Sequence, residues 1–144
     1  MSSPALIDLA DFLERHRQAD LSLTAVFQDR FSVTVGYLSQ RELLQARRRS
    51  LASDGSGPAD PQDRFMGEMA KLVRSWRGLT LATLAELTNV ALPDGADPAA
   101  EVPCTPANVA ALFNELPAFY EFVLAQAGDL AAMRRARAGE ELKN

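Results

Sequence analysis

Apolar positions near the start of the chain recur at helical spacing: Leu6, Leu9, Ala10 and Leu13. Ser3-Pro4, just before them, is typical of an N-cap followed by proline in the first turn. These positions predict a first helix that ends near Gln18.

From Leu21 the period changes to two. Two runs of alternating apolar and polar residues, 21–28 and 31–37, meet at Asp29-Arg30 and predict a β-hairpin. The turn lacks Asn-Gly or Asp-Gly, so its type stays open. Because an isolated hairpin is marginally stable in water, it must pack on helices or pair an edge with another chain. The hairpin is therefore a candidate site of self-association.

A change in composition divides the chain into two parts. Ser39 with Glu42 forms a capping box that opens a helix through Leu51. Residues 53–61 are small, polar and rich in helix breakers. We therefore expect an N-terminal helix, hairpin and helix over 1–52, a flexible linker over 53–61 and a helical part over 62–144. The pattern leaves open whether the first part folds alone or packs on the second.

The second part shows mainly the helical period. A strong apolar stripe predicts a helix that ends near Gly78, and its members are Phe65, Met69, Leu72, Val73 and Trp76. Residues 79–90 suggest a short helix, with a strand left open by their threonines, and 93–103 read as a loop.

Two more helices follow the loop. Thr105 should cap one of them, and Pro117 should start a fresh helix or kink the old one. The apolar face of the last helix is formed by Phe119, Phe122, Val123, Leu130 and Met133. The predicted fold is mainly α with an N-terminal β-hairpin (α+β), a small helical domain.

Composition indicates an ordinary soluble protein. The 144 residues are 47% hydrophobic and 24% charged, and the net charge is -4. This charge gives no electrostatic footprint for nucleic acid or an anionic membrane. Acidic Asp8 and Asp11 precede any long apolar run, which argues against a signal peptide, and no stretch is long enough to span a bilayer.

Cys104 is the single cysteine, and its position just before a predicted helix is one where a thiol can become reactive. A thiol enzyme would also need a base, and nothing places His16, the single histidine, near it. One cysteine and one histidine exclude the usual zinc sets, and no glycine-rich phosphate loop is present. We expect Cys104 to be a packing residue, and the protein to be no enzyme and to hold no metal or cofactor.

Two basic runs, Arg47-Arg48-Arg49 and Arg134-Arg135 with Arg137, lie toward the ends of predicted helices. Cations there complement the negative end of the helix dipole, which requires no partner. The alternative is a small helical nucleic-acid-binding or regulatory adaptor protein that uses these arginines, although a nucleic-acid site usually needs a wider basic stripe.

The second half resembles the tail assembly chaperones of long-tailed bacteriophages and prophages. The stretches that carry the resemblance are "LVRSWRGL" (72–79) and "VPCTPANVAALFNELPAFYEFVLAQA" (102–127), and it extends over about 21–132. The matching positions are Leu72, Val73, Trp76, Gly78, Leu79, Val102, Pro103, Thr105, Pro106, Asn108, Leu112 and Phe119. Proteins of this kind usually have Phe or Tyr at the place of Cys104, so no family function passes to the thiol.

The resemblance implies a non-enzymatic role in phage tail assembly. Such chaperones bind the long, largely helical tape-measure protein and keep it soluble while tail-tube subunits assemble around it. They work in the host cytoplasm and are absent from the mature virion. A frameshift-extended form would carry the contact to the tail-tube protein, and Lys143-Asn144 is compatible with a slippery run of adenines.

Under this hypothesis five residues are candidate partner-binding or core anchors: Leu72, Trp76, Phe113, Phe119 and Tyr120. Aromatic side chains dominate both protein cores and protein interfaces. The sequence does not separate these two roles.

Overall fold

The computed structural model describes residues 6–16, 20–52 and 60–143. Its elements, in chain order, are α1 Leu9–Arg15, β1 Ser22–Phe27, β2 Phe31–Gly36, α2 Gln40–Leu51, α3 Pro61–Ala70, β3 Val73–Arg77, α4 Leu81–Thr88, α5 Pro106–Glu115, α6 Pro117–Ala127 and α7 Leu130–Lys143. The three strands form one antiparallel sheet in the order β1-β2-β3. The predicted α+β class, a small helical domain with an N-terminal hairpin, is confirmed.

The hairpin forms where the period of two predicted it. Its register runs without interruption from Ser22 opposite Gly36 to Phe27 opposite Phe31. Gln28 and Asp29 both have positive φ, and the Arg30 N–H closes the turn by donating to the Phe27 carbonyl over 2.9 Å. Positive φ is usually supplied by glycine or asparagine, which explains why the sequence did not reveal the turn type.

The prediction of one helix that runs through Trp76 and ends near Gly78 is wrong. α3 ends at Ala70, and the chain continues as β3, which pairs with β2. The register shifts between Thr34 and Val35, so Val73 and Trp76 both face the core although they are three residues apart. A β-bulge therefore produced a spacing that is typical of a helix.

The boundary between the two predicted parts is crossed by both sheet and core. β2 and β3 pair across it, and one cluster of buried side chains takes members from both sides. Most of the predicted linker, 53–59, lies outside the described residues, whereas Asp60 caps α3 and Pro61 is its first residue. The sequence left open whether the first part folds alone or packs on the second, and the structure shows that the N-terminal hairpin packs on the second part.

Helix starts follow the local signals where the structure describes them. Ser39 and Glu42 form the expected capping box of α2, Thr105 caps α5, and Pro117 begins α6. Thr80 caps a helix over Leu81–Thr88, so the strand alternative there is wrong.

The two end helices differ from expectation. The long last helix is divided, because α6 ends at Ala127 and the Asp129 carboxylate accepts the Ala132 N–H over 3.0 Å at the start of α7. α1 is capped by Asp8 and ends at Arg15; Ser3-Pro4 and Gln18 lie outside the described residues. None of the residues of α1 is buried, so its apolar face does not join the core.

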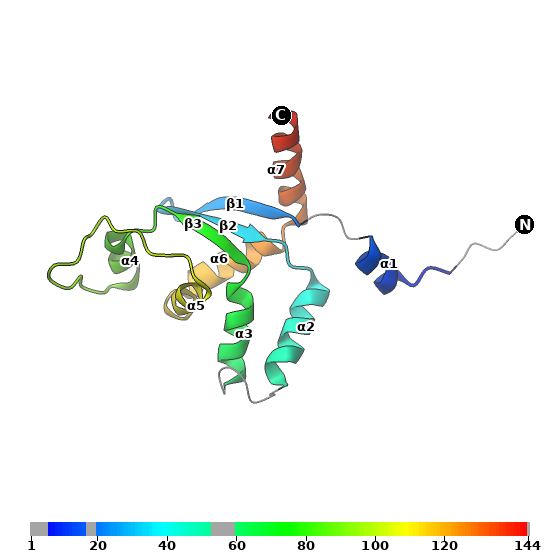
Figure 1. Ribbon diagram of the computed structural model, residues 1–144, viewed down its shortest axis with the longest axis horizontal. Helices are drawn as coiled ribbons and strands as arrows, with labels where there is room; N and C mark the ends of the chain where they lie inside the picture. Colours follow the sequence, from blue (N-terminus) through cyan, green and yellow to red (C-terminus); the bar gives the residue numbers. More distant parts are fainter. Residues whose placement is uncertain (1–5, 17–19, 53–59, 144) are drawn as a thin grey trace, which may run out of the picture.

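The helices beneath the sheet cover one of its faces, and α1 stands apart from them (Figure 1). α6 packs against β1 and β2, while α3 packs on α2 and α5. At the centre lies Phe119, which is 0% exposed. Its ring meets the rings of Phe27 at 5.3 Å, Phe31 at 5.7 Å and Phe113 at 5.6 Å between centroids.

We predict that Phe119→Ala lowers the free energy of unfolding by about 3–5 kcal/mol, because it removes this ring and leaves a cavity. Urea unfolding followed by circular dichroism measures the change. Phe12→Ala makes the same chemical change on exposed α1 and should cost less than about 0.5 kcal/mol. Similar losses in the two variants would contradict the placement of Phe119 at the centre of the core.

Candidate functional site

The structure gathers four of the five predicted anchors into one aromatic cluster. Phe113, Phe119 and Trp76 are buried, and Tyr120 is half-buried with its ring 5.1 Å from that of Phe113. Leu72 is also half-buried and packs at the margin of the core. Of the five anchors, only Leu72 and Tyr120 therefore keep an appreciable exposed surface.

Trp76 and Cys104 join β3 to the segment before α5. The Trp76 Nε1–H donates to the Val102 carbonyl over 2.7 Å. Cys104 is half-buried against the core. Burial raises the pKa of the Cys104 thiol, and the Trp76 backbone N–H, which favours the thiolate, offsets part of that rise. A raised pKa makes the thiol a poorer nucleophile at neutral pH.

His16 lies in a different setting from Cys104. It is exposed at the end of α1, where its ring lies 4.7 Å from that of Phe12. Across 6–16, 20–52 and 60–143, no three His, Cys, Asp or Glu residues gather as a metal site would require. In the same ranges, no helix is both long and apolar enough to cross a membrane.

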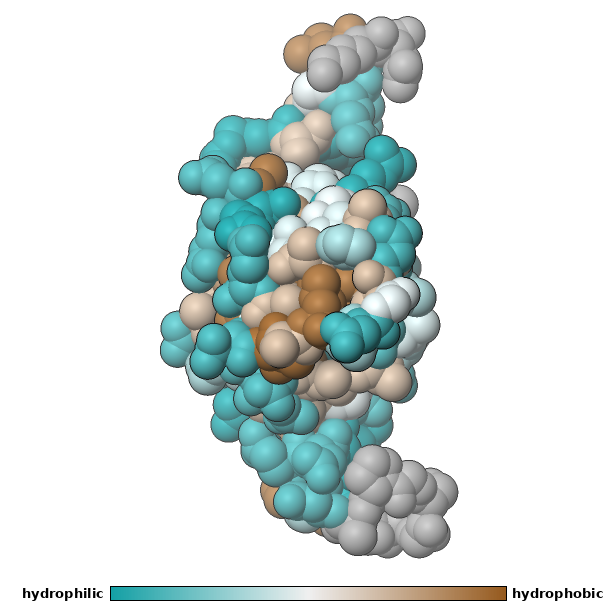
Figure 2. All heavy atoms as spheres, turned by 90° about the vertical axis from the view of Figure 1, so that its left-hand side faces the viewer, coloured by the Kyte–Doolittle hydropathy of each residue, from teal (hydrophilic) through white to brown (hydrophobic). Residues whose placement is uncertain are grey.

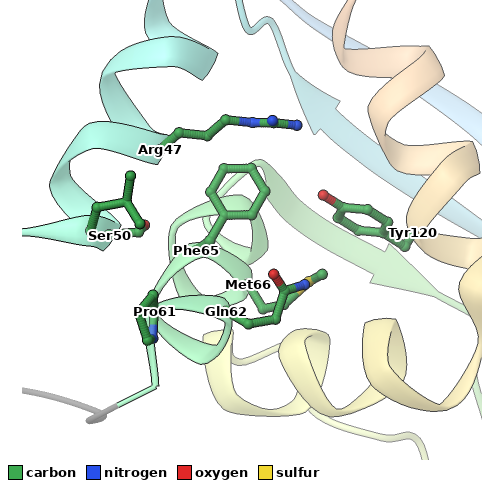
Figure 3. Close-up of a pocket in the computed structure, with 8 residues that line it drawn as sticks. Arg47, Ser50, Pro61, Gln62, Phe65, Met66 and Tyr120 are labelled. Atoms are coloured by element: carbon green, nitrogen blue, oxygen red, sulfur yellow. The ribbon is translucent and has the colours of Figure 1, made fainter.

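One pocket of about 360 Å³ lies between α2, α3 and α6 (Figure 3). Phe65 and Met66 form its apolar wall, and the Tyr120 hydroxyl points toward Phe65. The Arg47 guanidinium lies over the Phe65 ring, 5.3 Å from its centroid. Burial raises the pKa of Tyr120, and the charge of Arg47 offsets part of that rise. A pocket with an apolar wall, and with a cation and a hydroxyl at its rim, suits a ligand that has an apolar side chain next to a polar group.

Some arginines of the two basic runs make contacts within the chain. Besides the contact of Arg47 with Phe65, Arg49 pairs with Glu68 over 3.3 Å. Arg137 pairs with Glu141 over 3.4 Å, and it lies inside α7 and not at its end as expected. These contacts use part of the charge that a nucleic-acid site would need.

Two helices leave apolar surface open to solvent. In and before α1, five large apolar side chains are between 47% and 102% exposed: Leu6, Ile7, Leu9, Phe12 and Leu13. The ion pair of Arg41 with Glu14, at 3.9 Å, and a 3.4 Å bond from Arg41 to the Ala10 carbonyl join α1 to α2. The apolar face of α1 is therefore exposed, and the described contacts that join this helix to α2 are polar.

The second open surface lies over α4 at the opposite end of the molecule. α4 contains a single charged residue, Glu86, and none of its residues is buried. Figure 2 shows apolar residues gathered in the middle of this face, with a polar rim. The half-exposed or exposed large apolar residues of α4 and the loop after it are Leu81, Leu84, Leu87, Val90 and Leu92.

α4 is nevertheless firmly placed. The Leu81 N–H donates to the Ala100 carbonyl over 2.9 Å, the Ala82 N–H donates to the Pro98 carbonyl over 3.0 Å, and Arg30 of the hairpin turn pairs with Glu86. The sequence pattern did not predict this surface, although the near absence of charge in Leu81–Thr88 was a usable signal.

These features define a class: a small α+β protein with a buried aromatic core and with two helices, α1 and α4, in which no residue is buried. The chain matches the family described as YdaY prophage protein over residues 34–144 and belongs to that family. It is therefore a prophage protein. Neither the curated proteins nor the solved structures gave a match to the chain.

We predict that Cys104 makes folding sensitive to alkaline pH. Because its pKa is raised in the folded protein, the unfolded chain loses the thiol proton first. The stabilisation is complete below the unfolded pKa and is lost as the pH rises through the folded pKa. Between about pH 8 and about pH 10 the free energy of unfolding should fall less in Cys104→Ala than in the native protein.

Denaturant titrations at each pH measure this difference. Tyr120 contributes equally to the pH dependence of both proteins. Parallel curves would contradict the burial of the thiol.

Proposed function

We propose that this protein is a non-enzymatic phage tail assembly chaperone, which binds the tape-measure protein and keeps it soluble while tail-tube subunits assemble around it. Two observations support the proposal: the chain belongs to a prophage family, and its sequence over about 21–132 resembles tail assembly chaperones. The structural observation that carries it is the pair of helices, α1 and α4, in which no residue is buried.

The proposed client is a long and largely helical chain that is prone to aggregation. An amphipathic helix can bind such a client by covering its apolar stripe, with anchors at helical spacing. Leu9 and Leu13 supply that spacing on α1, and the surface over α4 supplies a second contact at the other end of the molecule. Many copies along one client would gain affinity through avidity.

The proposal places the protein in the host cytoplasm and outside the mature virion. Its second partner would be the tail-tube protein, reached by a frameshift-extended form. Of the predicted anchors, Tyr120 is the one that lines the pocket between α2, α3 and α6, so we assign it a client contact and Trp76, Phe113 and Phe119 a core role.

We predict that Leu9→Ser combined with Leu13→Ser lowers the amount of soluble tape-measure protein that copurifies on co-expression. Removal of a hot-spot residue costs about 2 kcal/mol or more at an interface, equivalent to a loss of about thirtyfold or more in affinity. These leucines are 64% and 49% exposed, so the variant should unfold at the same urea concentration as the native protein. The matched control is Leu142→Ser, which changes a leucine that is 89% exposed on α7.

A second variant tests the other end of the molecule. Val90 is 60% exposed beside α4, so Val90→Glu should weaken client binding with little effect on folding. If the client is captured equally by the native protein and by both variants, these surfaces are not its binding sites. If the native protein neither solubilises nor copurifies with the client, and no longer product is made in the same cells, the proposed function is wrong.

A further inference from the structure

The two edges of the sheet differ in how they are covered. The outer edge of β3 faces the segment before α5, where the Trp76 backbone N–H meets the Cys104 thiol and the Val102 N–H donates to the Leu79 carbonyl over 2.8 Å. A β-bridge between Thr80 and Glu101 extends this cover. Within the described residues, no strand or β-bridge pairs with the outer edge of β1, although α7 lies beside this strand.

The register shows which backbone groups of β1 face outward. The Tyr37 N–H donates to the Leu21 carbonyl over 2.9 Å, so the backbone of Leu21 faces β2. In an antiparallel pair the inward and outward backbone groups alternate along the strand. The N–H and C=O groups of Ser22, Thr24 and Val26 therefore point away from β2, and the side chains of these three residues are exposed. α7 packs beside β1 but leaves these side chains exposed.

β1 also lacks the features by which edge strands usually avoid other chains. Ser22–Phe27 contains no charged residue and no proline, and its register with β2 has no bulge. β3, by contrast, carries a register shift and two arginines. A regular, uncharged edge strand is a template for pairing with another strand.

On the same side, apolar residues at the margin of the core remain partly exposed. Leu23 and Ala25 face the helices but are only half-buried. Phe122 of α6 packs on Phe27 at 5.2 Å between ring centroids and is also half-buried. A chain that pairs with β1 would therefore gain apolar contacts below the sheet in addition to backbone hydrogen bonds.

We propose that β1 pairs with β1 of a second copy of this chain, antiparallel and about a two-fold axis at Thr24. This register sets Thr24 opposite its own counterpart and Ser22 opposite Val26, so every outward backbone group of the three residues gains a partner. No like charges meet, because the strand has none. The result is a six-stranded sheet whose two outer edges are the covered β3 strands, so pairing stops at two copies. The inference does not rest on the proposed function.

Thr24→Pro tests the pairing directly. Proline removes the outward N–H and places its ring against the incoming strand, and it is tolerated in an edge strand where that N–H faces solvent. Two backbone hydrogen bonds about the axis are lost, so the dimer dissociation constant should rise at least about tenfold. Thr24→Val is the matched control, because it loses the same hydroxyl and keeps the N–H. Sedimentation velocity over a concentration series measures the dissociation constant.

A cross-linking experiment covers the case in which Thr24→Pro does not fold. In a Cys104→Ala background, Thr24→Cys should give a covalent dimer with a short bis-maleimide, whereas Ser75→Cys, exposed on β3, should not. A native protein that is monomeric throughout the concentration series would overturn the proposal. Equal cross-linking at the two positions, or a folded Thr24→Pro that dimerises as tightly as Thr24→Val, would also overturn it.

Discussion

The fold depends on the packing of one ring, Phe119, against aromatic side chains from every strand. Phe27 of β1, Phe31 of β2 and Trp76 of β3 surround it on the sheet side, and Phe113 of α5 meets it from the other. These rings come from both sides of the boundary at 53–59, so the cluster joins the two halves of the sequence into one core. Edge-to-face and tilted contacts of this kind contribute beyond the area that they bury.

The parts of this fold that the sequence predicted are those set by local chemistry. Ser39, Thr105 and Pro117 act within one helical turn of themselves, and the starts of α2, α5 and α6 follow from them. β3 could not be found in this way, because it exists through pairing with β2, and the bulge near Arg74 gives Val73 and Trp76 a helical spacing. A long-range contact decided that segment, and a single sequence does not display such contacts.

The candidate site shows the same division. Trp76, Phe113 and Phe119 were predicted as candidate partner-binding or core anchors, but a residue type that suits both a core and an interface does not say which one it serves. Burial separates them, because these three face inward while Tyr120 reaches the pocket beside Phe65. The apolar surface over α4 was missed because its leucines are half-buried, and a periodic pattern does not distinguish half-buried from fully buried positions.

Under the proposed function, a buried aromatic core holds the sheet and α6 together, and the exposed apolar faces of α1 and α4 bind the client. Hydrogen–deuterium exchange, measured on the free protein and on its complex with the tape-measure protein, tests this most directly. The amides of β2, β3 and α6 should be protected in both states, and those of α1 should exchange fast in the free protein and gain protection in the complex, with the α4 region also slowing. Fast exchange of α1 in both states, with new protection confined to other elements, would contradict the account.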